Sequence, residues 1–444
     1  MMKKNDHIIA TCQGYTNEGH GVVKIDGYPL FVKGMMKDEE GELIVTLMKK
    51  TYGYAKLHKL HKANPMRIQS QCALAKQCGG CQLQHMDYAE QKAFKTQKVK
   101  DIIQRIGKCN APVYDVLGMD DPWYYRNKGQ VPVGVEKNRV KMGFYRLNSN
   151  QIIDCEHCAI QSQKINAIMQ TFRGLLETYD LAHFFRHLLI KDGFHSGELM
   201  AVLIVRARKI PHLNAMVEAL VEAHPEIKTV VLNINQRNDN VILGDKEVTL
   251  YGNGQIYDVL DGLKFSISSK SFYQVNPIQT KVLYQTALDF ANLTGDETVI
   301  DLYCGVGTIS MFLARKAKKV IGIEIVDAAI QDAKRNAKLN GIENIEFHCA
   351  DAGTYAKKLA SQKLIPDVVV VDPPRKGCDG LTLDSIVTMA PKRIVYVSCD
   401  PATLARDIAI LETKGYKCEK VQPVDMFPHT HHVENVCLLS KKEK

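Results

Sequence analysis

Cys399 is placed to act as a nucleophile. It lies in the run Ser398-Cys399-Asp400-Pro401, at the carboxyl end of an apolar strand predicted over residues 393–398, and a proline-led helix follows at once. In an open parallel sheet this edge is where ligands bind. A helix N-terminus beside the thiol favours the thiolate, which is the nucleophilic form. The alternative is a buried structural cysteine, a common core residue.

Two acidic residues are candidates for work beside this thiol. Glu434 enters an apolar strand predicted over residues 433–439, where partial burial would raise its pKa and suit it to proton abstraction. Asp372 opens the turn Asp372-Pro373-Pro374-Arg375, and the two prolines would hold its carboxylate rigidly over the sheet edge. The alternative for Asp372 is a plain strand-to-helix turn. Three histidines precede Glu434 in the pattern H-x-H-H; on an irregular segment this favours packing and RNA contacts over a metal site.

A glycine-containing turn indicates a nucleoside cofactor. The run Asp301-Leu302-Tyr303-Cys304-Gly305-Val306-Gly307-Thr308 follows a predicted strand, and glycine lets the backbone turn tightly against a ligand. Glu324 ends the next strand, 19 residues after Gly305, where an acid can grip a ribose diol. Asp351, after the third strand, could contact the adenine side. The chain has neither G-x-G-x-x-G nor a P-loop lysine, so a cofactor without phosphates, S-adenosylmethionine (SAM), is favoured over a dinucleotide.

Three regions must position these residues. Residues 1–62 form short alternating strands with glycine turns, typical of a small OB-like β-barrel. Residues 63–264 mix strands and helices as an α+β domain, in which 90–121 could pack on the third region. Residues 265–444 alternate apolar strands with helices, which predicts an α/β doubly wound, Rossmann-like parallel sheet. Its strands are predicted over 298–302, 320–325, 345–348, 367–371, 393–398, 417–424 and 433–439.

Composition points to an RNA partner. Of a net charge of +9, +7 falls between residues 91 and 146, where aromatic residues interleave with the basic ones. Basic side chains bind phosphates, and aromatic side chains stack on unpaired bases. Within this stretch we expect RNA contacts from Tyr125, Arg126 and Lys128, and outside it from Arg375. The sequence holds no apolar run long enough for a membrane span and no visible signal peptide, so we expect a cytoplasmic protein with reduced thiols.

Several motifs together resemble the RNA uracil-5-methyltransferase family, over nearly the whole chain. They are Ser271-Phe272-Tyr273-Gln274-Val275-Asn276, the Asp301–Gly307 run, Asp372-Pro373-Pro374-Arg375, Ser398-Cys399-Asp400-Pro401 and His432-Val433-Glu434. The likeness is greatest to the bacterial branch that modifies 23S rRNA and carries an N-terminal TRAM domain. The resemblance implies that Cys399 adds to C6 of uracil, that Glu434 removes the C5 proton, and that Asp372 orients the pyrimidine. It implies SAM contacts from Gln274, Tyr303, Gly305, Thr308, Glu324, Asp351 and Asp372.

A cysteine-rich segment reads Cys72-x5-Cys78-Gly79-Gly80-Cys81, with Cys155-Glu156-His157-Cys158 much later. Two C-x2-C pairs far apart could form a zinc ribbon through Cys155. The family's iron–sulfur members carry C-x5-C-G-G-C plus one distant cysteine. The resemblance therefore implies a [4Fe–4S] cluster on Cys72, Cys78, Cys81 and Cys158, with zinc or empty thiols as alternatives.

These observations predict a monomeric, SAM-dependent enzyme without an obligate protein partner that forms 5-methyluridine in one or two positions of 23S rRNA. One alternative is a tRNA T-loop uracil-5-methyltransferase; we expect residues 1–160 to discriminate, because that branch usually lacks the barrel and the cysteine segment. Another is a non-catalytic iron–sulfur RNA-binding or ribosome-assembly protein, which the Cys399 and Glu434 pair disfavours.

Overall fold

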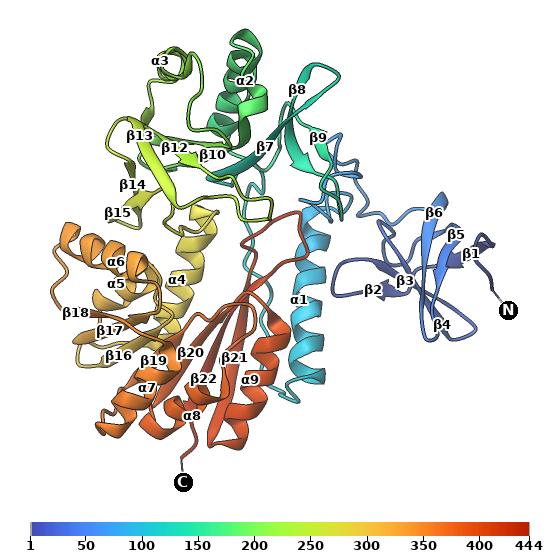
Figure 1. The fold of residues 1–444 in the computed structure, drawn as a ribbon. Coiled ribbons are helices and arrows are strands. Elements are labelled where there is room, and N and C mark those ends of the chain that lie inside the picture. The colour runs from blue at the N-terminus through green and yellow to red at the C-terminus, as the bar shows by residue number, and fades with distance from the viewer. Residues whose placement is uncertain (1, 444) are drawn as a thin grey trace.

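The computed structural model describes residues 2–443, and its first unit is a six-stranded sheet that projects to one side of the molecule (Figure 1). The strand order is β1-β5-β6-β4-β3-β2. Asp26 and Gly27 both have positive φ and turn the chain between β3 and β4, as the Asp-Gly pair predicts. Alternate residues of the strands meet in one small apolar core. The strands are β1 His7–Thr11, β2 Gly14–Tyr15, β3 Gly21–Ile25, β4 Tyr28–Val32, β5 Glu40–Met48 and β6 Gly53–Lys62.

A single helix, α1 (Tyr88–Arg105), stands between this sheet and the C-terminal part of the molecule (Figure 1). The Asp87 carboxylate caps it by accepting a hydrogen bond from the Ala89 amide. Its buried side packs against α9 (Pro401–Thr413) and β21 (Tyr416–Val424), which belong to the C-terminal sheet. The helix is therefore part of the C-terminal core, although it precedes that core by almost 200 residues of chain.

The central part is a seven-stranded sheet in the order β13-β12-β11-β10-β7-β8-β9, with α2 and α3 packed on it. β10 and β11 are buried along their whole length. A separate hairpin, β14 with β15, follows. The boundary predicted at 264/265 falls inside β15. The elements are β7 Lys128–Glu136, β8 Arg139–Tyr145, β9 Ile152–Asp154, α2 Gln163–Thr178, β10 Phe185–Asp192, β11 Leu199–Val205, α3 Leu213–Ala223, β12 Ile227–Ile234, β13 Lys246–Tyr251, β14 Gln255–Leu260 and β15 Leu263–Ser268.

The C-terminal part is a seven-stranded sheet in the order β18-β17-β16-β19-β20-β22-β21, with a large apolar core on each face. The seven predicted strands are present to within about two residues at each end. The expectation of a purely parallel sheet was wrong, because β22 runs antiparallel to both β20 and β21. A loop, not a crossover helix, joins β21 to β22, and a loop connection reverses the strand direction.

The remaining elements of this part complete the sheet and its two helical layers (Figure 1). They are α4 Pro277–Ala291, β16 Thr298–Leu302, α5 Thr308–Ala314, β17 Lys319–Glu324, α6 Asp327–Leu339, β18 Ile345–Cys349, α7 Ala352–Ser361, β19 Val368–Val371, α8 Gly380–Met389, β20 Arg393–Ser398 and β22 Glu434–Lys441. Within residues 2–443, no helix is both long and apolar enough to cross a bilayer.

Candidate active site

Three adjacent strands bring Cys399, Glu434 and Asp372 to one edge of the C-terminal sheet. β19 and β20 are parallel and end side by side, so Asp372 and Cys399 follow at the same edge. β20 and β22 are antiparallel, and their last pair is Ser398 with Asn435. One step beyond that pair, Cys399 faces Glu434. The three side chains predicted to do chemistry therefore converge, although they lie on separate segments of the chain.

The Cys399 thiol is half-buried, and its environment disfavours the thiolate. Burial, and then the neighbouring Glu434 and Asp372, raise the pKa of this thiol to about 11. We predicted that the N-terminus of the following helix would favour the thiolate, and this was wrong. The Asp400 carboxylate already accepts the hydrogen bonds of Ala402 and Thr403, the first free amides of α9. The N-terminus of α9 is therefore not free to stabilise a thiolate at Cys399.

Two carboxyl groups at this edge are held in a poorly solvated place. Burial, with a contribution from Asp372, raises the pKa of Glu434 to about 8, and the Glu434 residue is only 6% exposed. Burial raises the pKa of Asp372 to about 7. The exposed Arg375 acts in the opposite direction on both Glu434 and Cys399. A carboxyl that titrates near neutral pH is suited to accept a proton from carbon and return it to solvent.

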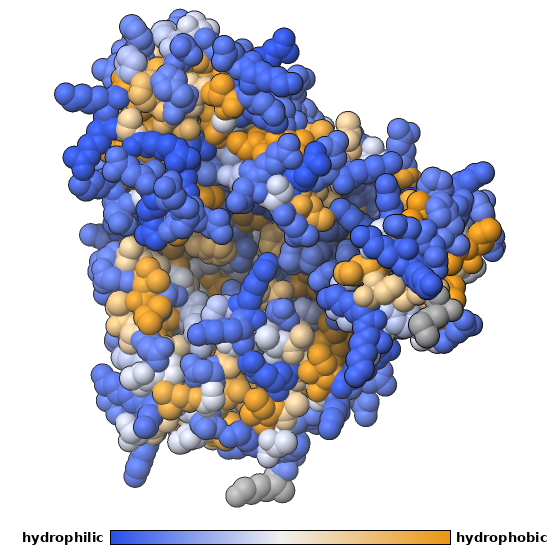
Figure 2. Space-filling view, turned by 45° about the vertical axis from the view of Figure 1, so that its right-hand side comes forward, coloured by the Kyte–Doolittle hydropathy of each residue, from blue (hydrophilic) through white to orange (hydrophobic). Residues whose placement is uncertain are grey.

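Beside this edge lies a cavity of about 1150 Å³ between the central and C-terminal parts. The seven residues predicted to hold the cofactor all line it: Gln274, Tyr303, Gly305, Thr308, Glu324, Asp351 and Asp372. Figure 2 shows from one side that the molecule is hollowed between these two parts, with hydrophobic residues in the floor and hydrophilic residues at the rim.

The cradle of this cavity is built for close approach to a nucleoside. Gly305 and Gly307 both have positive φ, and a Cβ on Gly307 would lie 2.8 Å from the Phe347 ring. The Glu324 carboxylate accepts hydrogen bonds from the amides of Gly305 and Val326, which fixes it at the end of β17. Asp351 caps α7 through Thr354. These acids and the exposed apolar side chains of the segment after β17 fit an uncharged adenosine moiety such as that of SAM.

Comparison with known proteins decides the family. A profile of the tRNA (Uracil-5-)-methyltransferase family matches residues 87–442. The chain belongs to this family. Two relatives described as uncharacterized RNA methyltransferases, from Bacillus cereus ATCC 10987 and Halalkalibacterium halodurans, are 47% and 46% identical to it. These matches cover 100% and 99% of this chain and 98% of each relative. The crystal structure of the Pyrococcus abyssi tRNA (uracil-54, C5)-methyltransferase with S-adenosyl-L-homocysteine aligns with a TM-score of 0.77 at 25% identity, over 97% of this chain and 99% of that one.

Membership makes this chain an RNA methyltransferase, and SAM as the methyl donor agrees with the cavity just described. The alignment also removes one of our criteria. We expected residues 1–160 to separate the rRNA branch from tRNA enzymes. The aligned tRNA enzyme covers 97% of this chain and therefore shares most of residues 1–160. The overall architecture of this region does not discriminate between rRNA and tRNA as substrates.

The cysteine-rich segment of this methyltransferase lines a cavity of about 240 Å³. Its lining includes all four predicted cluster ligands and the alternative ligand, namely Cys72, Cys78, Cys81, Cys158 and Cys155. Burial raises the pKa of Cys81 and of Cys155 to about 12. Among residues 2–443, however, no group of three or more cysteine, histidine or acidic side chains is arranged as a ready metal-binding group. The structure thus gathers the donors without forming the cluster geometry.

The predicted RNA contacts of the methyltransferase have different environments. Tyr125 is fully buried and its hydroxyl donates to the Pro428 carbonyl, so its prediction as a base-stacking residue was wrong. Arg126 and Lys128 are half-buried and line the cysteine cavity. In the described part of the chain neither forms an ion pair with Asp120 or Asp121, the alternative partners. Arg375 is exposed beside the catalytic edge.

Sequence reasoning missed the residues that hold the loop between β21 and β22. Lys95 and Asp425 form an ion pair in which both side chains are completely buried. One signal was available, since Gln91 and Lys95 share the apolar face of α1 with Val99 and Ile102. A lysine on the buried face of a helix needs a partner.

Proposed function

We propose that this protein converts uridine to 5-methyluridine in 23S rRNA, through a covalent bond between Cys399 and C6 of the target uracil. The observation that supports this chemistry best is the register of β20 and β22, which brings Cys399 and Glu434 to the same edge of the sheet as Asp372, a residue that lines the cofactor cavity. An electron-rich C5 is needed for methylation, and addition of sulfur at C6 creates it.

The steps use the residues of this edge as follows. The Cys399 sulfur bonds to C6 as the thiol proton passes to solvent, and the electrons of the C5–C6 π bond move onto C5 and the C4 oxygen as an enolate. Bound SAM would supply the methyl group that C5 takes up. Glu434, ionised, then accepts the C5 proton, the C5–C6 double bond re-forms, and the Cys399 sulfur leaves as thiolate. The net products are 5-methyluridine, S-adenosylhomocysteine and one proton.

Asp372 would orient the uracil for this sequence. With a pKa raised to about 7, it can accept a hydrogen bond from the base N–H when ionised or donate one to a base carbonyl when protonated. Arg375, exposed next to it, would bind the phosphate on the flank of a nucleotide that is flipped out of its helix. Lysines 56, 59 and 62 are exposed along β6 and support a TRAM-type RNA-binding role for the N-terminal sheet. The strand order supports a Rossmann-like assignment for the C-terminal sheet.

The chemistry is tested with purified protein, labelled SAM and RNA. Cys399→Ala is expected to abolish methylation and to leave SAM affinity within about threefold, because the thiol faces the base and not the cofactor. Glu434→Gln is expected to form the methylated adduct but not to release it, so an RNA–protein species survives denaturing electrophoresis. Near-normal turnover of Cys399→Ala contradicts the nucleophile assignment. A wild-type protein that binds SAM and RNA but forms neither product nor adduct favours the non-catalytic alternative.

The substrate is decided by offering 23S rRNA fragments and tRNA transcripts to the same preparation. Methylation of 23S fragments with tRNA unmodified supports the proposal, and the reverse result assigns the protein to the tRNA-modifying branch, as in the P. abyssi enzyme. Mapping 5-methyluridine in RNA from a deletion strain then locates the one or two sites. We further propose a monomer acting in the cytoplasm.

We propose that the cysteine cavity holds a [4Fe–4S] cluster on Cys72, Cys78, Cys81 and Cys158. The four thiols line one cavity, and Arg126 and Lys128 beside them would offset the negative charge of thiolates. When bound, a cluster would tie the segment after the N-terminal sheet to the central sheet. Anaerobically purified protein should contain about four irons. Stoichiometric zinc without iron would assign the site to a ribbon that uses Cys155 instead.

A further inference from the structure

The general base of the proposed reaction opens a strand whose approach is an irregular loop. Residues 425–433 leave β21 after Val424 and return to β22 at Glu434, and Val424 pairs with Glu434 in the antiparallel register. We call residues 425–433 the strap. Its first residue, Asp425, is therefore next to the backbone position opposite Glu434. Contacts that fix Asp425 therefore also fix the end of the strap that lies beside Glu434.

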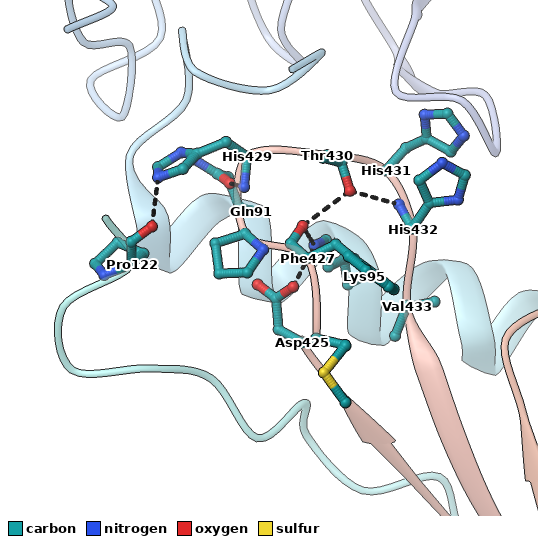
Figure 3. A network of polar contacts seen from close by, with 12 residues as sticks. Gln91, Lys95, Pro122, Asp425, Phe427, His429, Thr430, His431, His432 and Val433 are labelled. Atoms are coloured by element: carbon teal, nitrogen blue, oxygen red, sulfur yellow. Dashed lines mark hydrogen bonds and ion pairs between the residues drawn. The ribbon is translucent and has the colours of Figure 1, made fainter. Parts of the chain in front are cut away.

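Two donors on α1, Lys95 and Tyr88, hold Asp425, and Figure 3 shows the first of them. The Lys95 ammonium lies 2.5 Å from one carboxylate oxygen of Asp425 and also donates to the Phe427 carbonyl at 3.0 Å. The Tyr88 hydroxyl donates to the other carboxylate oxygen at 2.9 Å. Both side chains of the ion pair are 0% exposed, so solvent does not screen it.

The same stripe of α1 holds the rest of the strap. The Gln91 side-chain oxygen accepts from the His429 amide at 2.9 Å, and Lys98 donates to the His431 carbonyl at 2.8 Å. Residues 88, 91, 95 and 98 are spaced by three and four, so they lie on one face of the helix. The strap is thus fixed at its start, its middle and near its end by one rigid element.

A buried ion pair is a costly way to hold a helix against a strand. Removing two charges from water offsets most of their attraction, and an apolar pair of similar volume would join α1 to β21 at least as firmly. What charged and directional hydrogen bonds supply is a unique geometry. A unique geometry matters at the strap, because a base displaced by about 1 Å from its proton can lose up to about 100-fold in rate.

We infer that Lys95 and Asp425 are positioning residues for Glu434: they fix the strap so that the Glu434 carboxylate faces C5 of the uracil held on Cys399. The inference rests on the proposed function, since it assigns a role within that reaction. A positioning role predicts a change in the rate of proton removal without a loss of fold stability. A simple packing role predicts that both change together.

The test uses the double variant Lys95→Met/Asp425→Leu, which keeps the volume of the pair and removes its charges and hydrogen bonds. Single-turnover reactions measure formation of the RNA–protein adduct and its decay to free methylated RNA. If the pair positions Glu434, adduct forms within about twofold of the wild-type rate and decays about 10- to 100-fold more slowly, at an unchanged or higher melting temperature. Normal adduct decay in a folded double variant overturns the inference.

Two further variants keep the test decisive. Tyr88→Phe removes one hydrogen bond from Asp425, together with the one that the hydroxyl accepts from the Met119 amide, without leaving a buried charge unpaired. It should slow adduct decay in the same direction by about two- to fivefold. The matched control is Glu39→Gln, which breaks the ion pair between the buried Glu39, just before β5, and Arg67, in the segment after β6. It should lower the melting temperature and leave adduct decay unchanged; slowed decay in this control would assign the effect to general destabilisation and overturn the inference.

Failure of the inference and failure of the proposed function give different results. If Glu434→Gln traps an adduct and Lys95→Met/Asp425→Leu does not, the proposed function stands and the positioning role is wrong. If neither the wild type nor Glu434→Gln forms an adduct with any RNA offered, the covalent mechanism itself is wrong, and the positioning role falls with it.

Discussion

Buried carboxyl groups at the catalytic edge and in the surrounding framework have opposite electrostatic surroundings. Asp425 and Glu39 each meet a cation, Lys95 and Arg67 respectively. Burial works to raise the pKa of Glu39, but the hydrogen bonds and charge of Arg67 outweigh it and lower that pKa. At the catalytic edge, burial raises the pKa of Glu434 to about 8 and that of Asp372 to about 7.

This difference shows that the fold tolerates carboxyl groups without a paired cation at the candidate active-site edge. A paired carboxylate stays ionised at all working pH values and fixes geometry, so it suits a framework. An unpaired buried carboxyl is unstable as an anion, so it exchanges its proton near neutral pH and destabilises the fold when ionised. The proposed reaction moves a proton at a carboxyl of the second kind, Glu434, whereas carboxylates of the first kind, Asp425 and Glu39, hold the strap and the segment before β5.

The largest expected effect comes from removing an unpaired carboxyl. Glu434→Gln should lose essentially all turnover and yet gain stability at high pH. In the folded protein Glu434 keeps its proton up to about pH 8, while the unfolded chain loses it near 4.5, so ionisation destabilises the native state as pH rises between these values. The variant should therefore be more stable than wild type at pH 9 by on the order of 3 kcal/mol, and about equal at pH 5. Denaturant titration at both pH values measures this, and equal stabilities at pH 9 would mean that Glu434 is not electrostatically strained.

Removing a paired carboxyl should do the reverse. Glu39→Gln is expected to cost about 1–3 kcal/mol of folding free energy at pH 7, because charged hydrogen bonds to Arg67 are lost. The chemical step should be unchanged, since Glu39 directly precedes β5 of the N-terminal unit and does not line the cofactor cavity. Thermal unfolding and single-turnover methylation of the same preparation compare the two quantities. A large fall in the methylation rate with no fall in stability would break the contrast between framework and catalytic carboxyls.

Much of this contrast could not be predicted from the sequence, whereas the position of the reactive groups could. The strands of the C-terminal sheet are continuous apolar runs, and Asp372 and Cys399 each follow such a run, so the edge shared by these two residues was predictable. Glu434 opens its strand and reaches the same edge only because β22 is antiparallel to β20. Lys95 and Asp425 are separated by 330 residues, and only the packing of α1 on β21 brings them together. The reversal of β22 likewise depends on the long-range pairing of strands.

Local chemistry also misled where side chains compete for one partner. The free amides at the start of the helix after Cys399 were expected to stabilise a thiolate, but the Asp400 carboxylate accepts their hydrogen bonds instead. Tyr125 stands among basic residues as a base-stacking side chain would, yet it is buried against the strap. Its segment is irregular, and without periodicity the sequence does not reveal which side chains face inward.

A moderate effect is expected on the pH dependence of turnover. Since Glu434 must be ionised to accept the C5 proton, the rate of adduct decay should rise with pH and level off above about pH 8. Adduct formation should rise further, because the pKa of Cys399 is raised to about 11. Quenched-flow measurements between pH 6 and 10 separate the two profiles. A decay rate that is flat across this range would indicate that proton removal does not use a group of raised pKa.

The smallest expected effect comes from Arg375, the exposed cation that lowers the pKa of Glu434. Arg375→Gln should move the midpoint of the decay profile to higher pH by about half a unit or less, because solvent screens an exposed charge. Arg375→Lys should keep the wild-type midpoint, since it keeps the charge. High salt should move the wild-type midpoint towards that of Arg375→Gln and leave the variant where it is. RNA affinity, measured alongside, should fall at every pH when the charge is removed. A lower affinity with an unmoved midpoint would make Arg375 a phosphate contact alone, and the pKa of Glu434 would then be set by burial and Asp372 without help from this cation.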